Sequence, residues 1–463
     1  MTSQRHPLLP AAGPARHRPV ARLGCLAAAV AGLLVGAPAW SIDLRQAYEA
    51  AVANDATIRS SRATADANRE QLPQAQAQRL PNVSLSAGRN YNDLTSRTQN
   101  FLGEPSTTIN RYYSGNQALT IRQPIYRPFI GALVKQAEAV VQDADATLES
   151  AEQGLVVRVG EAYFEALLAE EQLGLIGAQK STYTTQLDAA KKSFSAGSGT
   201  RTDIDEAQAR LDMTYAQELE VQQNVEFTRR KLETITGQPV GTLARLDLAR
   251  FKPGAPMPNL LDDWISRAEQ ASPDIKALRA RLEAANFEID KAKAGHKPTL
   301  DAVAQWSRNS SDSVTNVNSR YDNKSIGLQL TIPIYAGGYV NSTVRQAVAS
   351  AERARELLEA ARLDLSVRVH REFRGMTEGV VRISALEQAV RSAEQAVLSN
   401  QMSFKAGART TLDVLNAEQQ KTTALRDLAQ ARYLYVASRL RLQSLAGDER
   451  AASVSEINTW LAL

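Results

Sequence analysis

The chain has 463 residues, which is enough for two or three ordinary domains. Its formal net charge of +4 comes from residues 1–41, which hold four arginines and no acidic residue. Without that segment, basic and acidic side chains are equal in number, 50 of each. A nucleic-acid-binding protein keeps a basic excess, so we expect no nucleic-acid partner.

Residues 1–41 have the pattern of a secretory signal peptide. Arginines precede an apolar run, 25–36, that is too short to span a bilayer. Small residues suited to cleavage follow at 37–39 or 39–41. The alternative is a retained membrane anchor. Cys25, the only cysteine, opens the apolar run instead of following it, so we expect no lipid anchor.

Four later segments alternate apolar and polar residues with the period of a β-strand: 83–88, 119–122, 299–306 and 326–334. One apolar and one polar face suit a barrel wall with lipid outside and water inside. The alternative is an ordinary four-stranded sheet packed on helices. No segment after residue 41 has the roughly 20 apolar residues that a membrane-spanning helix needs.

The flanks of these strands also carry information. Pro81 and Pro298 precede strands, and Pro124 and Pro333 mark the exits into helices. Polar stretches at 92–111 and 309–323 predict long external loops. Aromatic residues near the strand ends predict interfacial belts: Tyr91, Tyr112, Tyr113, Tyr126, Trp306, Tyr321 and Tyr335.

Very long helices are predicted at about 127–195 and 338–404. The first would be roughly 100 Å long at 1.5 Å per residue. Its apolar residues recur at coiled-coil spacing: Leu148, Ala151, Leu155, Val159, Ala162, Ala166, Ala169 and Leu173. Each long helix ends at a glycine, Gly197 or Gly407, and a second helix follows, at about 202–232 or 411–445.

The chain is internally duplicated. Arg158 recurs as Arg368, Phe194 as Phe404 and Asp203 as Asp413, each 210 positions later. Such self-similarity indicates a repeated structural unit. We expect a signal peptide at 1–41, a first repeat at 42–245, an inter-repeat segment at 246–270, a second repeat at 271–446 and a C-terminal segment at 447–463. The inter-repeat and C-terminal segments are expected to form an equatorial collar.

Four strands cannot close a membrane barrel, because the smallest such barrels have eight. An open sheet would leave its edges unsatisfied in lipid, so the chain must assemble with copies of itself, in a number that this argument leaves open.

Catalysis finds little support in the sequence. Beyond residue 41 the only histidines are His296 and His370, far apart in the chain. There is no phosphate-binding Gly-Lys-Ser/Thr loop and no metal-ligand spacing. We therefore expect no enzyme activity, no cofactor and no metal.

The duplicated plan, the Pro-Ile-Tyr sequences at Pro124 and Pro333, the turn at 404–415 and the Tyr433-Leu434-Tyr435 run resemble the TolC family of outer-membrane channel-tunnel proteins. The resemblance implies an α+β membrane protein, a homotrimer whose twelve-stranded β-barrel has four strands from each chain. A long α-helical coiled-coil tunnel would continue the barrel through the periplasm.

The same resemblance implies export across the outer membrane together with a periplasmic adaptor and an inner-membrane ABC transporter. The missing lipid-bearing cysteine favours type I secretion of a protein, with an RTX-type toxin of the adenylate cyclase–haemolysin class as cargo. One alternative is a multidrug efflux channel. Another is a periplasmic coiled-coil adaptor, which would not need four spanning strands.

The resemblance also implies a gate at the periplasmic tip, formed by Thr202, Asp203, Phe404, Arg409, Asp413 and Asn416. Arg409 matches the family's basic gate residue, and Thr202 and Asp203 match its partners. Phe404 replaces a tyrosine. Asp413 matches one acidic ring of the constriction, and Asn416 replaces the second acid.

Four of the gate residues also have a simpler interpretation. Asp203 and Asp413 each follow a threonine by three residues, at Thr200 and Thr410, which predicts helix caps. Arg409 would then be a solvated turn charge. Phe404 would be a hydrophobic contact under a glycine helix cap.

Overall fold

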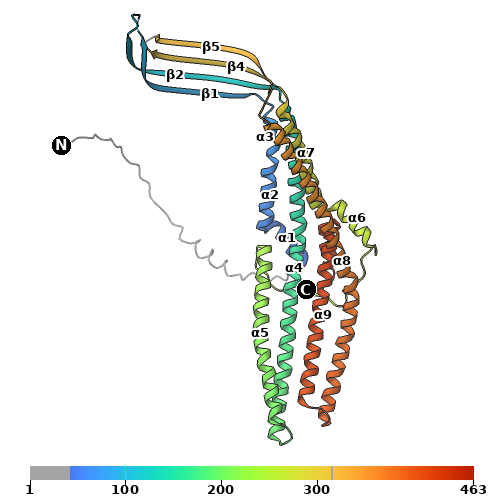
Figure 1. Cartoon of the computed structure of the whole chain (residues 1–463). Coiled ribbons are helices and arrows are strands. Elements are labelled where there is room, and N and C mark those ends of the chain that lie inside the picture. Colours follow the sequence, from blue (N-terminus) through green and yellow to red (C-terminus); the bar gives the residue numbers. More distant parts are fainter. Residues whose placement is uncertain (1–41, 100, 314–315, 463) are drawn as a thin grey trace, which may run out of the picture.

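The computed structural model describes residues 42–99, 101–313 and 316–462. The expected signal peptide, 1–41, lies outside the described residues. A sheet lies at one end of the molecule, and a bundle of long helices extends from it (Figure 1). Among the helices of the described part, none is both long and apolar enough to cross a membrane.

The sheet is antiparallel and has the strand order β1-β2-β4-β5. Its members are β1 (Asn82–Gln99), β2 (Pro105–Tyr126), β4 (Thr299–Ser313) and β5 (Asn316–Thr331). Pro81 and Pro298 directly precede β1 and β4, as predicted. The register sets Leu119 of β2 beside Trp306 of β4. The two sequence repeats therefore meet at the centre of the sheet.

The long loops expected at 92–111 and 309–323 were wrong, because the strands continue through them. β1 runs to Gln99 and β2 begins at Pro105. Cross-strand polar contacts hold these extensions: Arg111 Nε donates to Asp93 at 3.0 Å. Five of the aromatics expected at strand ends therefore lie within the strands: Tyr91, Tyr112, Tyr113, Trp306 and Tyr321.

The strand expected over 326–334 also ends early. β5 stops at Thr331, ahead of Pro333, which has no backbone N–H to donate to a ladder.

The long helices are present where the spacing predicted them. α4 (Pro128–Ser195) has 68 residues and α8 (Tyr339–Lys405) has 67, so each is roughly 100 Å long. α4 opens with Pro128 in its first turn, where the missing N–H costs nothing. Of its predicted packing face, Leu155, Val159, Ala162, Ala166 and Ala169 are buried.

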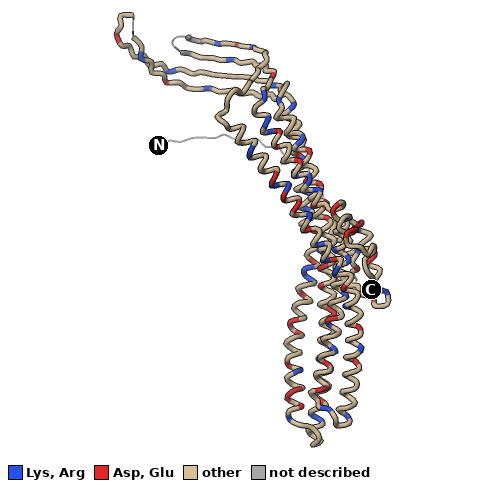
Figure 2. Tube along the Cα trace, turned by 45° about the vertical axis from the view of Figure 1, so that its right-hand side comes forward, with Lys and Arg blue, Asp and Glu red and all other residues tan. Residues whose placement is uncertain are grey.

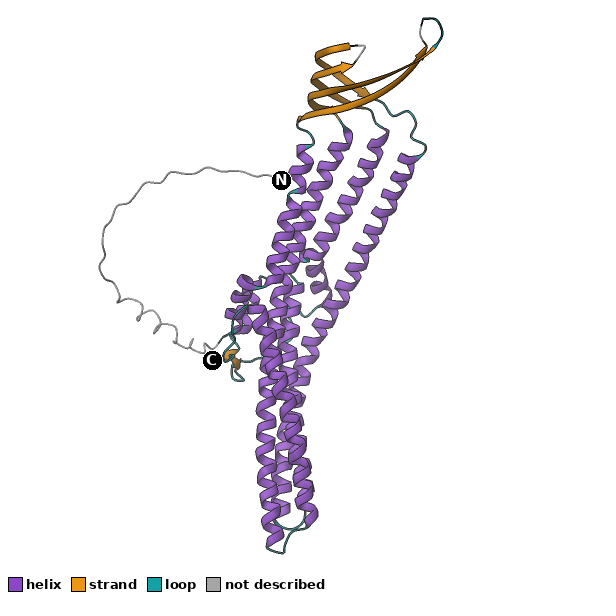
Figure 3. Cartoon of the chain, turned by 90° about the vertical axis from the view of Figure 1, so that its left-hand side faces the viewer, coloured by secondary structure: helices purple, strands orange, loops and turns teal. Residues whose placement is uncertain are grey.

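Shorter helices complete the bundle on either side of its waist (Figures 1 and 3). Toward the sheet, α1 (Leu44–Asn54), α2 (Ala56–Arg69) and α3 (Gln71–Ala77) pack along α4, and α6 (Leu261–Ala271) packs against α8. The helix α7 (Pro273–Lys293) contacts both α4 and α8, and the short η1 (Ala294–His296) follows it beside α4. Away from the sheet, α5 (Arg201–Thr236) pairs with α4 and α9 (Thr411–Leu445) pairs with α8. Acidic and basic residues are interspersed along the traces of these helices (Figure 2).

At the waist, the inter-repeat and C-terminal segments join. β3 (Arg245–Leu246) pairs with β6 (Leu461–Ala462), which follows α10 (Arg450–Asn458). The boundary expected between 245 and 246 falls inside β3. Tyr163 of α4 is fully buried, and its hydroxyl lies 3.0 Å from the carbonyl oxygens of Ile42 and Ala244. The largest hydrophobic cluster surrounds this point and ties both repeats together.

Candidate functional site

Each helix pair ends in a tight turn at the tip farthest from the sheet (Figure 1). Gly197 and Gly407 have positive φ angles of 76° and 74°, a left-handed conformation that favours glycine. Thr200 and Thr410 then cap α5 and α9, and each accepts a hydrogen bond from the backbone N–H three residues later. The threonine caps predicted from the sequence are confirmed.

Asp203 and Asp413 complete these capping boxes. The Thr200 hydroxyl donates to Asp203 Oδ2 at 2.6 Å, and the Thr410 backbone N–H donates to Asp413 Oδ2 at 3.0 Å. A carboxylate that accepts such bonds is favoured in its charged form. The pKa of both carboxyl groups is therefore below the ordinary value.

The pKa of Asp203 also reports a link between the repeats. The Thr200 hydroxyl is the largest cause of its lowering, partial burial opposes it, and the side chain of Thr411 lowers it further. Thr411 is the first residue of α9 and is buried. A hydroxyl from the second repeat therefore stabilises the ionised carboxylate of the first.

Arg210 makes the clearest polar connection between the two tips. Its guanidinium Nη2 donates to Asn416 Oδ1 at 2.6 Å, and its Nη1 donates to Gln419 Oε1. These side chains lie one turn apart on α9. A forked donor that spans two acceptors fixes the relative position of α5 and α9.

An apolar cluster lies beside these polar links. Its buried members come from three helices of both repeats: Tyr183, Leu187, Ala207, Leu211 and Leu415. Leu415 of α9 is fully buried among residues of α4 and α5. The contact between the two tips of one chain therefore has both an apolar and a polar component.

The remaining predicted gate residues lie on the turns without such links. Arg409 contacts Asp413 of its own turn at 3.5 Å. Among the described residues, neither Arg409 nor Phe404 has a hydrogen bond or ion pair with Thr202 or Asp203. Phe404 and Thr202 are exposed. The contact between Arg409 and the first-repeat turn stays a prediction for the assembled protein.

Sequence reasoning missed Thr411, Arg210 and Gln419. A signal for Arg210 was available, because it lies seven residues after Asp203, on the same face of a helix. Ala207 lies between them on that face and is fully buried. Following this face along α5 would have identified Arg210 as a residue that meets a neighbouring helix.

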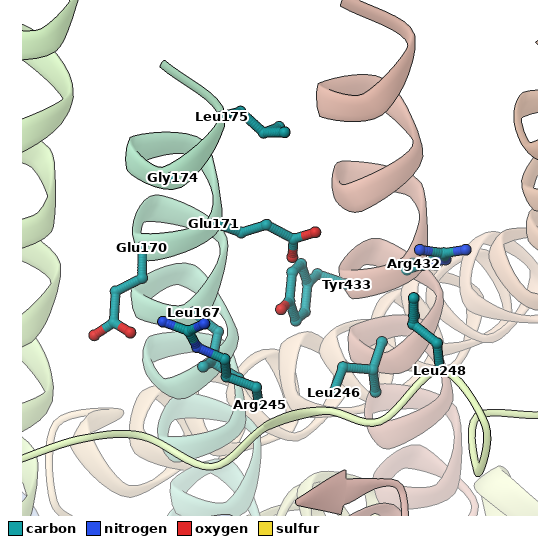
Figure 4. A pocket seen from close by; sticks show the side chains of 10 residues that line it. All are labelled: Leu167, Glu170, Glu171, Gly174, Leu175, Arg245, Leu246, Leu248, Arg432 and Tyr433. Atoms are coloured by element: carbon teal, nitrogen blue, oxygen red, sulfur yellow. The ribbon is translucent and has the colours of Figure 1, made fainter. Parts of the chain in front are cut away.

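A cavity of about 310 Å³ lies at the waist, where the segment 245–248 crosses α4 and α9 (Figure 4). Two of its charged groups have ion-pair partners: Glu170 pairs with Arg229 at 2.7 Å, and Arg432 with Glu387 at 3.0 Å. Burial, with further contributions from Glu171 that include a hydrogen bond, raises the pKa of Tyr433. The paired charges indicate that this cavity has a structural role, where the inter-repeat segment packs against α4 and α9.

A family model described as outer membrane efflux protein matches residues 47–238 and 264–448, one match in each repeat. The chain belongs to this family, the TolC-type outer-membrane channels. It is therefore an outer-membrane channel that extends into the periplasm, a transport protein and not an enzyme. The adaptor alternative is excluded by this membership.

Curated relatives cover nearly the whole chain. The Proteases secretion protein PrtF of Dickeya chrysanthemi is 31% identical over 92% of this chain and 93% of its own length. The Alkaline protease secretion protein AprF of Pseudomonas aeruginosa is 30% identical, covering 90% and 86%. The Outer membrane protein TolC of Vibrio cholerae is 30% identical, covering 95% and 97%.

The fold is shared with solved structures. The outer membrane protein VceC from Vibrio cholerae superposes with a TM-score of 0.72 at 20% sequence identity, covering 88% of this chain and 96% of that one. This chain therefore has the fold of this class of channels, in which each chain contributes four antiparallel strands that continue into long paired helices.

Proposed function

We propose that three copies of this chain form an outer-membrane exit duct for type I protein secretion. Within the described residues, β1 and β5 each pair along one edge only. In lipid such open edges must be satisfied, and neighbouring copies would supply the missing strands. Three chains would give a twelve-stranded barrel.

The names of two relatives support protein cargo over drugs. PrtF and AprF are both described as secretion proteins for proteases. Each is as similar to this chain as the TolC protein is, and each aligns with nearly all of it. In the proposed pathway, a periplasmic adaptor links the duct to an inner-membrane ABC transporter, and a secreted protein, such as an RTX-type toxin, is the cargo.

The tips of the helix pairs would form the periplasmic gate of this duct. The links of Arg210 and Thr411 between repeats support a closed arrangement within one chain. In the trimer, Arg409 would contact Thr202 and Asp203 of a tip, Asp413 would form an acidic ring on the axis, and Phe404 and Asn416 would line the same constriction.

A complementation experiment separates secretion from efflux. Cells that lack their own TolC-type channel receive this chain together with the adaptor and ABC transporter of a protease secretion system. We expect protease activity in the culture medium. In parallel, the same chain is expressed with a proton-driven drug pump and its adaptor. Restored drug resistance without protease secretion would favour the efflux alternative.

The assembly is tested separately on the purified protein in detergent. Light scattering should give the mass of three chains, and the protein should form conducting channels in planar bilayers. A monomer that does not conduct would contradict the proposed duct whatever the cargo.

A further inference from the structure

One face of the sheet must contact lipid. The register sets Leu85, Leu119, Trp306 and Lys324 in one row across β1, β2, β4 and β5. Side chains two residues along each strand share this face, and they include Ile326 beside Ala304 and Leu328 beside Ala302. The opposite face carries Ser, Thr and Gln. The apolar face is therefore the outward face of the barrel wall.

Basic residues appear on this same outward face nearer the hairpin ends. Arg89 lies opposite Gly115, Gly115 opposite Ser310, and Ser310 opposite Arg320. Two further basic residues, Arg308 and Lys324, lie on the same face in the next two rows toward the helices. We name Arg89, Arg308, Arg320 and Lys324 the basic cluster. All four are exposed.

The acidic residues nearby do not neutralise the cluster. Arg308 Nε donates to Asp322 Oδ1 at 2.8 Å and its guanidinium lies 5.6 Å from the Trp306 ring. Arg89 lies over the Tyr113 ring at 4.9 Å. In the described part of the chain, Arg89, Arg320 and Lys324 have no carboxylate partner within ion-pair distance. Arg89 and Arg320 thus carry charges that no carboxylate pairs, and Lys324 shares the single charge of Asp322 with Arg308.

The height of the cluster matches the outer interface of a membrane. Leu300, beside Tyr126, marks the helix-side end of the outward face. Arg308 is eight residues farther along β4, and Ser310 is ten. A tilted spanning strand takes about 9–11 residues to cross the hydrocarbon core. Arg308 and the row of Arg89 and Arg320 therefore lie at the level of the outer-leaflet headgroups. Lys324, in the row of Trp306, lies only six residues from Leu300, and its long side chain can extend toward that level.

The two positions between Arg89 and Arg320 in this row have small side groups, so the surface there lies close to the backbone. Gly115 has no side chain, and Ser310 Oγ would lie only 2.9 Å from a Cβ placed there. With strands about 4.8 Å apart, the backbones of Arg89 and Arg320 are separated by roughly 14 Å across three strand spacings. Two arginines thus flank a shallow floor that offers a hydroxyl, a shape suited to phosphate groups and their oxygen acceptors.

We propose that the basic cluster binds the phosphate groups of outer-leaflet lipid. The inference rests on the outer-membrane location of the channel and not on its cargo. Arginine and lysine side chains form charge-assisted hydrogen bonds with phosphate, and the aromatic rings of Tyr113 and Trp306 lie beside two of the guanidinium groups. Bound lipid of this kind fixes the depth of the barrel in the membrane.

Binding is measured on the full-length protein in neutral detergent, by thermal unfolding during titration with diphosphoryl lipid A, phosphatidylcholine or inorganic phosphate. We expect stabilisation by lipid A only. The triple variant R89Q/R320Q/K324Q should bind lipid A roughly a hundredfold more weakly, or about fivefold for each side chain. The matched control R122Q removes an arginine from the opposite face, where Arg122 lies opposite Val303, and should bind as wild type.

The proposal is overturned if the triple variant binds lipid A with unchanged affinity, or if R122Q weakens binding equally. It is also overturned if phosphatidylcholine or inorganic phosphate stabilises the protein as strongly as lipid A. Should the triple variant fail to assemble, the single variants R89Q and R320Q are titrated in its place. An undiminished affinity in both would then reject the cluster.

Discussion

Arg127 holds Asp301 across the junction between the sheet and the bundle. Its guanidinium Nε donates to Asp301 Oδ1 at 2.8 Å and a second nitrogen bonds Oδ2. Arg127 directly precedes α4 in the first repeat, and Asp301 belongs to β4 in the second. The Asp301 side chain is 7% exposed and that of Arg127 is 33% exposed. The pair therefore joins the repeats where strands become helices.

Replacing Arg127 by alanine should destabilise the protein by about 2–4 kcal/mol, because it leaves the Asp301 carboxylate buried without a partner. The partial exposure of Arg127 places the value near the lower end. Heat-induced loss of the β-sheet signal in circular dichroism gives the change. R97A, which removes an exposed arginine of β1 that has no contact with Asp301, is the control. A double variant R127A/D301A should recover part of the loss, and equal effects of R127A and R97A would contradict the assignment.

Arg210→Ala should loosen the closed tips, since it removes both donors to Asn416 and Gln419. Charge-assisted hydrogen bonds contribute about 1 kcal/mol or more at partly exposed sites, so single-channel recording should show an open population raised severalfold. Arg201→Ala is the matched control, because among the described residues Arg201 forms its ion pair within its own helix, with Asp205. An identical closed-state conductance of R210A and wild type would rule out the tip link.

Much of this architecture was predictable because it depends on local patterns. Helix length follows from apolar spacing and from the absence of proline, and the caps at Thr200 and Thr410 depend on residues three positions apart. The strand extensions were missed because a polar strand such as 92–99 lacks the apolar alternation that distinguishes a strand from a loop. The links of Arg210 were missed because their partners on α9 are about 200 residues away in the sequence.

Acid should weaken the contact between the two helix tips of one chain, but only well below neutral pH. The pKa of Asp203 is below its ordinary value of 3.8, chiefly through the Thr200 hydroxyl. A group with a lowered pKa stabilises the folded form above its ordinary pKa, and this contribution is lost as the pH falls through the lower, folded value. Channel conductance should therefore be constant from pH 7 to about pH 5 and rise below about pH 4.

The control for this pH dependence is Asp203→Asn. Because asparagine does not titrate in this range, D203N should have the looser tip at every pH and a smaller rise in acid. A wild-type channel whose conductance rises already between pH 7 and pH 5 would show that another group controls the tip.

The proposed acidic ring predicts opposite changes in cation selectivity for two substitutions. Three copies of Asp413 around one axis would attract cations into the constriction. Within one chain the pKa of Asp413 is lowered, first by the Thr410 backbone N–H, so the carboxylate is charged at neutral pH. Asp413→Asn should therefore reduce cation selectivity. Asn416→Asp, which adds a second acid one turn later on α9, should increase it by a smaller amount, because the Arg210 guanidinium that bonds residue 416 partly neutralises the new charge. Reversal potentials under a salt gradient measure both changes. If neither substitution moves the reversal potential, Asp413 serves only as the cap of α9 and the constriction lies elsewhere.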